Sequence, residues 1–339
     1  MKKIVNIDTG IELPDGKPLI WSFDSTPIQT EDDGIAFLIS QLTYLESMTY
    51  EAMYREIEFT KFITPNYSDP DYVQSITYLS YDTVTSASAA GSNSEDMPEA
   101  KLNAYKSVIP VFLGHNAYSY SLEELRISQQ QRMPLDTILA EAALRGYQEK
   151  AQRTAYFGDA DRNIYGLFNN PTLESGKKVG SVNWNTASND EIVQDMNNLL
   201  VDLWNESNQT FLADTLILPP DRWTKISSTR MDSGTDTTIL KFFEENNLYT
   251  QRRKMPLMID QSIEIGQAAS GTEAGNGRMM AYMNQERYLT MRIPIAWRSL
   301  TPQLQGVRFK IPCEFKIGGV DFRYLQSAKY QDFDTALTV

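Results

Sequence analysis

Apolar residues recur at helical spacing in the middle of the chain. The run starts at Met133-Pro134, follows i, i+3, i+4 spacing and stops before Gly158, with members Leu135, Ile138, Leu139, Ala142, Ala143, Gly146, Tyr147, Ala151 and Ala155. It predicts a helix over 134–157, about 36 Å long at helical rise, that ends at Gly158 in left-handed geometry. Its small residues, among them Ala142 and Ala143, predict close approach of another segment.

Similar spacing predicts helices over 33–57, 189–206 and 237–247. Alternation of apolar and polar residues predicts strands in RYLTMRIPIAW and FKIPCEFKIGGVDFRY, with a two-residue hairpin turn at Gly318-Gly319. TLILPPDRW predicts a strand followed by the start of a helix, and PLMIDQSIEI predicts a further strand. The region beyond the long helix is therefore α+β.

Two strand-like segments, 72–89 and 105–121, flank the polar loop 91–101. Together they predict a long antiparallel hairpin whose arms reach about 50 Å at strand rise. Such a ribbon is marginal in water by itself, so other parts of the structure must support it.

Composition excludes several classes of protein. The chain has 339 residues, 41% of them hydrophobic and 22% charged, as in ordinary globular proteins. No window approaches 18 consecutive apolar residues, and the N-terminus lacks the apolar core of a secretory signal. A net charge of −13 argues against tight binding through phosphate neutralisation. One cysteine, Cys313, excludes an internal disulfide and favours a reducing compartment.

The stretch GDADRNIYGLFNNP, residues 158–171, places Asp159, Asp161 and Asn163 at alternate positions. A calcium-binding EF-hand loop would need glycine at its sixth position and glutamate at its twelfth, but the chain has Ile164 and Asn170 there. Short polar side chains at a helix end more often bond to the local backbone. We therefore predict a turn formed by Gly158, Asp159, Asp161, Asn169, Asn170 and Pro171.

The remaining chemistry is sparse. The single histidine, His115, has no identifiable nucleophilic or metal-binding partner, and Cys313 is expected to be a buried, unreactive thiol. The glycine-containing loop 271–277 lacks the GK[ST] ending of a phosphate-binding loop and resembles a mobile loop tip. Adjacent carboxylates such as Glu123-Glu124 are more typical of a solvated helix start than of acid–base catalysis. We expect no catalytic residue, no metal and no cofactor.

The order of these elements resembles the major capsid proteins of tailed bacteriophages, whose Hong Kong 97-type fold is shared with encapsulins. In particular, it is similar to a prophage-encoded capsid group. The resemblance rests on YFGDADRNIYGLFNNP, where a helix ends, and on GRMMAYMNQERYLTMRIPIAWRSL, which enters the late strands. It covers nearly the whole chain, although its motifs are loose.

The resemblance implies an α+β fold with four parts. Residues 1–59 would be an N-terminal arm and helix, and residues 60–120 the extended hairpin called the E-loop. Residues 121–187 and 301–339 would form a peripheral domain that contains the long spine helix, and residues 188–300 an axial domain.

The function implied is structural: pentamers and hexamers of the chain would close an icosahedral shell around double-stranded DNA, with weak, non-specific DNA contacts and no membrane contact. The virion would be its location after assembly in the bacterial cytoplasm, with separate scaffolding, portal and decoration proteins as further partners. Two alternatives stay open, an encapsulin-type compartment that encloses protein and a hydrolase with an acidic site at Asp159 and Asp161. The predicted assembly contacts are Ile76, Tyr78, Lys101, Val108, Phe112, Glu273 and Arg278.

Overall fold

A computed structural model describes residues 55–84, 101–131, 135–232, 234 and 236–337. The chain divides into two compact units, residues 1–55 and 56–339. The predicted N-terminal arm, nearly all of the predicted helix over 33–57 and the hairpin tip lie outside the described residues.

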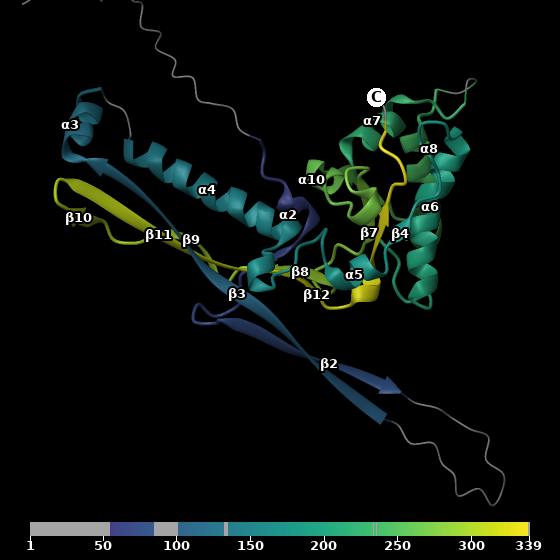
Figure 1. Ribbon diagram of the computed structural model, residues 1–339, viewed down its shortest axis with the longest axis horizontal. Coiled ribbons are helices and arrows are strands. Elements are labelled where there is room, and N and C mark those ends of the chain that lie inside the picture. The colour runs from purple at the N-terminus through teal and green to yellow at the C-terminus, as the bar shows by residue number, and fades with distance from the viewer. Residues whose placement is uncertain (1–54, 85–100, 132–134, 233, 235, 338–339) are drawn as a thin grey trace, which may run out of the picture. The chain divides into compact units, whose positions relative to one another are not determined.

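The longest strands form a five-stranded sheet (Figure 1). Along the sheet the order is β10 (Gln303–Gln305), β11 (Arg308–Gly318), β3 (Lys101–Ser121) and β2 (Ser75–Val84), and β9 (Ile295–Ser299) also pairs with β11. The two halves of β3 have different partners: residues 101–110 pair with β2, and residues 111–121 pair with β11. The predicted hairpin is therefore confirmed, but its second arm continues into the body of the subunit.

Two further sheets follow, one of three strands and one of five. One contains β1 (Pro65–Asn66), β8 (Leu289–Arg292) and β12 (Val320–Phe322). The other has the order β4 (Lys178–Val179), β13 (Ala328–Asp332), β7 (Arg278–Tyr282), β5 (Thr215–Leu218) and β6 (Met258–Gln261). The chain thus returns from residue 328 to a sheet whose other strands lie far earlier in the sequence.

The long predicted helix is α4 (Leu135–Phe157), which runs along β3 (Figure 1). It buries Tyr147, Ala151, Thr154, Ala155 and Tyr156, so the packed side is its C-terminal half. Ala142 is exposed and Ala143 half-buried, and the prediction of close packing at Ala142 was therefore wrong. The spacing indicated the helix but not the half of it that the sheet covers.

The other helices are α2 (Phe59–Phe62), α3 (Leu122–Gln131), α5 (Pro171–Ser175), α6 (Asn189–Glu206), α7 (Pro220–Ser228), α8 (Ile239–Asn246), α9 (Leu248–Arg253) and α10 (Ile263–Gly266), with 3-10 turns at Ala160–Arg162, Gly271–Glu273 and Leu325–Ser327. Helix α6 matches its predicted bounds because Ser188 and Glu191 form a capping box that fixes the first turn. Its apolar side, from Ile192 to Leu203, is buried in one of two hydrophobic cores. The second core packs α4 against β8, β11 and β12.

One prediction about the late strands was wrong. Gly318-Gly319 does not form a hairpin turn, because β12 pairs with β8 and not with β11. A Cβ atom at Gly319 would lie 2.9 Å from the carbonyl oxygen of Tyr165, so close packing explains this glycine. The pairings also cross the predicted domain boundary at residue 300, because β8 and β9 pair with β12 and β11, whereas β13 pairs with β7.

Candidate assembly surface

The distal ribbon, which we define as residues 75–84 of β2 and 101–110 of β3, has no further strand partner within the described part of the chain. Ile76 and Tyr78 are half-buried, whereas Val108 is 54% exposed. Lys101 lies at the last described pair, opposite Val84. The ribbon presents apolar surface and free backbone groups along β2, and such an edge is suited to contact with another chain.

The base of the distal ribbon is fixed by ion pairs. Arg298 on β9 contacts Asp71 at 3.0 Å and Glu314 on β11 at 2.7 Å. Hydrogen bonds to Glu314 and Asp71 raise the pKa of Arg298. Lys316 donates from Nζ to the carbonyl oxygen of Asp71 at 2.9 Å. The loop before β2 is therefore tied to two strands of the sheet.

A buried charge cluster lies beside Tyr78. Arg292 contacts Asp69 at 3.5 Å and Asp321 at 3.4 Å, and Arg323 also faces Asp321. Burial raises the pKa of Asp321 despite the two arginines, and burial likewise raises the pKa of Tyr78. This cluster joins β8 and β12 to the start of the ribbon.

Phe112, a predicted assembly contact, already has partners within the subunit. Its ring lies 5.7 Å from Lys150 Nζ and 5.0 Å from the guanidinium of Arg162. Asp159 forms ion pairs with both cations. Phe112 therefore links β3 to the end of α4. The carboxylate of Asp159 neutralises the two cations that contact this ring.

The stretch GDADRNIYGLFNNP forms a compact turn after α4. Gly158 has φ +66°, and a Cβ atom there would lie 2.0 Å from the carbonyl oxygen of Ile164, so only glycine fits. The Asn169 side chain accepts a bond from the backbone of Gly166 and donates to the carbonyl oxygen of Phe157. Asn170 caps α5, with Pro171 in the first turn. Asp161 is exposed, and no metal-binding cluster of His, Cys, Asp and Glu occurs among the described residues.

Arg278 cannot be a surface contact, contrary to our prediction, because its side chain is fully buried. It donates to Asp332 at 2.5 Å and 2.9 Å and to the carbonyl oxygen of Phe168 at 2.6 Å, and it pairs with Glu174 at 2.6 Å. Burial opposes its charge, but the hydrogen bonds and charges of Asp332 and Glu174 raise its pKa. The sequence of β7, RMMAY, did not distinguish a buried arginine from an exposed one.

Glu273, another predicted contact, is half-buried and lies 3.7 Å from Lys177. Lys177 also donates to the carbonyl oxygen of Ser270 and to Asp332, at 2.8 Å and 2.6 Å. The loop that we predicted to be mobile is thus held at Ser270 by a lysine from the segment after α5.

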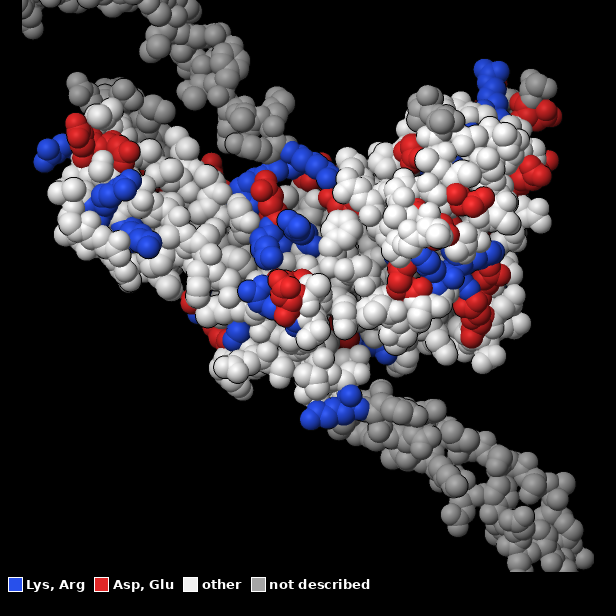
Figure 2. Space-filling model, in the orientation of Figure 1, with Lys and Arg blue, Asp and Glu red and all other residues white. Residues whose placement is uncertain are grey.

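The sequence did not point to the exposed apolar side chains at the β10–β11 turn. Leu304 is 63% exposed and Val307 69% exposed, on either side of Gly306 with φ +65°. Leu122 and Ile127 of α3 are exposed as well, and the Leu122 amide donates to the carbonyl oxygen of Val307. The sequence feature that could have identified this surface is the pair of apolar residues, Leu304 and Val307, on either side of a glycine turn, where polar residues are usual. Figure 2 shows that much of the surface in that view carries no charged side chain.

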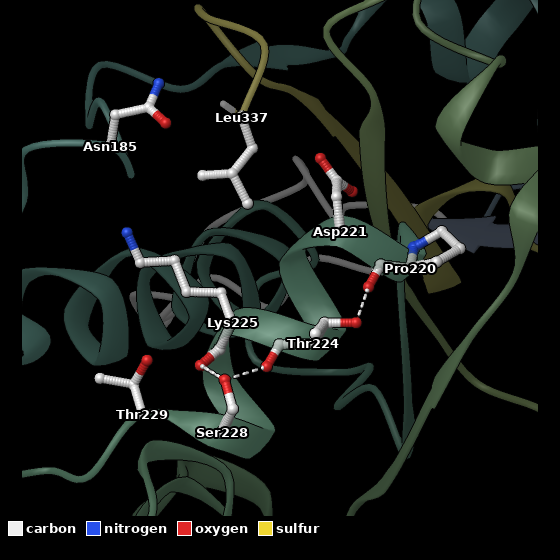
Figure 3. Close-up of a pocket in the computed structure, with 8 residues that line it drawn as sticks. All are labelled: Asn185, Pro220, Asp221, Thr224, Lys225, Ser228, Thr229 and Leu337. Carbon is white, nitrogen blue, oxygen red and sulfur yellow. Dashed lines mark hydrogen bonds between the residues drawn. The ribbon is translucent and has the colours of Figure 1, made fainter. Parts of the chain in front are cut away.

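The residues with reactive side chains are not arranged for catalysis. His115 is exposed on β3 opposite Glu314, and Cys313 is buried, which raises its pKa. A hollow of about 490 Å³ beside α7 is lined by Asn185, Pro220, Asp221, Thr224, Lys225, Ser228, Thr229 and Leu337 (Figure 3). Lys225 donates to the carbonyl oxygen of Trp184, and the drawn hydrogen bonds of Thr224 and Ser228 run to backbone carbonyls of their own helix. Lys225, Thr224 and Ser228 therefore use their polar groups to bond the backbone of the subunit itself.

Comparison with known families gives one match, to the family described as Major capsid protein, over residues 85–333. The chain belongs to this family. Its role is structural, so the prediction that it is not an enzyme is confirmed and the hydrolase alternative is wrong. The capsid protein associates with copies of itself into a shell, and its place is the capsid of a virion. Within the described residues, no helix has both the length and the apolar composition needed to cross a membrane.

Solved capsid structures share the fold. The capsid of Myoviridae Phage XM1 matches with a TM-score of 0.71 and 19% identity, covering 88% of this chain and 98% of that chain. A structure of Microbacterium phage Oxtober96 gives 0.59 and 9%, covering 90% and 99%. The capsid of a native GTA particle gives 0.57 and 12%, covering 87% and 95%. The predicted α+β, Hong Kong 97-type fold is confirmed. Comparison with curated protein sequences finds no match.

Proposed function

We propose that the chain assembles through pentamers and hexamers into an icosahedral shell around double-stranded DNA, inside a bacterial host's cytoplasm. The observation that carries this proposal is the distal ribbon, which continues the five-stranded sheet beyond the part of β3 that pairs with β11 and has no other strand partner among the described residues. Laid across a neighbouring subunit, it would bury Val108 and cover the edge of β2. Burial of apolar surface contributes about 25 cal/mol per Å², and a closed shell repeats that contact at every subunit.

The exposed apolar side chains at the β10–β11 turn support a second contact. Leu304, Val307 and Ile127 are exposed in the isolated subunit, and none of them belongs to either hydrophobic core. Large exposed apolar residues that gather at one end of a sheet are typical of an interaction surface.

The same reasoning gives a revised domain division as part of the proposal. The peripheral domain would comprise α4, the two sheets that contain β11 and β8, and the turn after α4. The axial domain would comprise α6 to α10 and the sheet that contains β7 and β13. Portal, scaffolding and decoration proteins remain predictions from the resemblance to phage capsids.

Negative-stain electron microscopy of the purified, expressed full-length chain tests the proposal. We expect closed particles of uniform diameter and, in particles from a phage-producing host, DNA protected from nuclease. A chain that stays monomeric in all assembly conditions would contradict the shell. Particles that hold a protein cargo and no DNA would favour the encapsulin-type compartment instead.

A further inference from the structure

Three aromatic side chains from distant segments meet at the surface near the end of α6. The ring centroids of Phe211, Tyr288 and Tyr324 form a triangle with sides of 5.5–5.7 Å. Tyr324 is 43% exposed and the adjacent Leu325 38% exposed. The packing of three rings against one another, with one edge open to solvent, provides a rigid apolar surface.

Two exposed arginines cover aromatic rings of the same region. The guanidinium of Arg252 lies 4.5 Å from the Trp204 ring, and that of Arg287 lies 5.9 Å from the Tyr288 ring. Ser207 connects the two parts, because its hydroxyl donates to the carbonyl oxygen of Trp204 and accepts from the amide of Phe211. We call Trp204, Phe211, Tyr288, Tyr324, Leu325, Arg252 and Arg287 the aromatic patch. Tryptophan, tyrosine and arginine are the residues that most often dominate binding energy at protein interfaces.

The loop that carries Phe211 has an unusual backbone. Asn208 and Gln209 are consecutive and have φ values of 51° and 63°. Left-handed geometry is uncommon for residues other than glycine, and two such residues in succession are held here by the bonds of Ser207 and by the Gln209 amide, which donates to the carbonyl oxygen of Trp204. The loop therefore fixes Trp204 and Phe211 relative to each other.

The aromatic patch carries two exposed cations, Arg252 and Arg287, on a protein whose net charge is −13. Arg253 and Lys254 follow Arg252 directly. Glu206 is neutralised by Lys329, whereas Glu286 accepts a hydrogen bond from the neutral Asn66 amide and keeps its charge. A partner with surplus carboxylates fits this surface best.

The chain itself contains such a segment. Residues 85–100, between the two strands of the distal ribbon, read TSASAAGSNSEDMPEA, with carboxylates at Glu95, Asp96 and Glu99 and neither lysine nor arginine. Met97 and Pro98 lie between these acids and supply apolar groups for the rings. We propose that the acidic segment 95–99 of one copy binds the aromatic patch of a second copy. This inference rests on the proposed function, since it names the surface that receives the ribbon.

Charge reversal in both partners tests the inference. R252E/R287E in the patch and E95K/D96K in the tip are each expected to abolish the particle peak in sedimentation, while the thermal midpoint of the free subunit stays unchanged. The combined four-site variant is expected to recover particles, because every copy then carries complementary charges again. Reversal of two exposed cations outside the patch, R230E and K241E, is the matched control and should leave assembly intact.

Disulfide trapping gives an independent readout. Subunits with Ser94→Cys are mixed with subunits with Leu325→Cys, assembled and oxidised. A covalent dimer in denaturing electrophoresis is expected, whereas Ser94→Cys mixed with Ser228→Cys on α7 should give none. Cys313 is buried and lies outside both sites.

The outcomes separate this inference from the proposed function. Wild-type particles together with normal assembly of both reversed variants would overturn the inference and leave the shell intact. Normal particles of R252E/R287E that lose their DNA would also overturn it, because the patch would then face nucleic acid. Failure of the wild-type chain to assemble would instead contradict the proposed function.

Discussion

The side-chain amide of Asn116 on β3 donates to the carbonyl oxygen of Ala143 on α4 at 2.6 Å. The same side chain accepts a hydrogen bond from the indole of Trp297 on β9 at 3.1 Å. Asn116 thus joins α4 to β3 and β9 through the carbonyl oxygen of Ala143, which faces the sheet. The first buried residue of α4 is Tyr147, one turn later.

We expect Asn116→Ala to lower the free energy of unfolding by about 1–3 kcal/mol, because the indole N–H of Trp297 loses its partner in a partly buried position. Chemical denaturation of the free subunit measures the loss. Ser119→Ala, an exposed change on the same strand, is the control and should be neutral. Equal stability of both variants would show that the bridge contributes nothing.

Arg278→Ala is expected to destabilise the free subunit by about 3–5 kcal/mol, because it leaves Asp332 and Glu174 without their buried partner. The measurement is again the unfolding free energy before any assembly. Arg253→Ala, at an exposed arginine, serves as the comparison. If Arg278→Ala subunits were as stable as wild type and only assembly failed, the original prediction of a surface contact would be restored.

Ala155 is fully buried on α4, whereas Ala142 on the same helix is exposed. Ala155→Leu should therefore cost about 1–3 kcal/mol through overpacking. Ala142→Leu should stay within about 0.5 kcal/mol of wild type, because it adds volume only toward solvent. Thermal unfolding of the two variants side by side checks the assignment of the packed half, and the reverse order of stabilities would contradict it.

These examples show which parts of the fold the sequence predicts. The helices α4 and α6 follow from local spacing and from caps such as Ser188, and the ribbon follows from alternation in two adjacent segments. The pairing of β11 with β3 could not be predicted, because the partners lie some 190 residues apart and period-2 patterns carry no information about which strands pair. The same holds for the aromatic patch, since Phe211, Tyr288 and Tyr324 each look like ordinary isolated aromatic residues in the sequence.

Tyr147 links stability to alkaline pH. Burial raises its pKa to about 12 in the folded subunit, from 10.0 for a free side chain. The neutral phenol is thus favoured in the folded state, so its contribution is complete below pH 10 and is lost as the pH rises from 10 through 12. Tyr147→Phe should remove this part of the pH dependence.

The measurement is the difference in unfolding free energy between wild type and Tyr147→Phe across that range. Burial raises the pKa of Tyr282 and Tyr330 as well, but both residues are present in the two proteins and their effects cancel in the difference. As the pH rises through this range, the unfolding free energy of wild type should fall relative to that of Tyr147→Phe by at most about 2 kcal/mol. A constant difference from pH 9 to 12 would show that the Tyr147 phenol is not desolvated.

The distal ribbon offers the sharpest test of assembly, provided that the deletion respects the pairing of β3. Removing residues 77–118 would take away strand residues that pair with β11 in the body of the subunit, so that deletion would damage the fold. Ile76 and Ile109 are directly paired, and a short Gly-Ser linker between them replaces residues 77–108 without disturbing the rest of β3. The shortened subunit should fold, because the removed residues form strand pairs only with each other; the loss of the Tyr78 hydrogen bond to Asp321 should lower its stability by about 1 kcal/mol.

The same subunit should form no shells, since it lacks the surface that would cover its neighbour. Hydrogen exchange supplies the complementary measurement in the wild-type chain: amides of 75–84 should exchange rapidly along their unpaired edge in free subunits and slowly in particles. A tip-only replacement of residues 85–100 by Gly and Ser keeps the paired strands and removes the acidic segment, so it separates the contribution of the tip to assembly from that of the strands. If the shortened subunit still closes into particles, the ribbon is dispensable and the contacts at Leu304 and Val307 must hold the shell. If it unfolds, the ribbon stabilises the subunit itself, which would contradict a role limited to assembly.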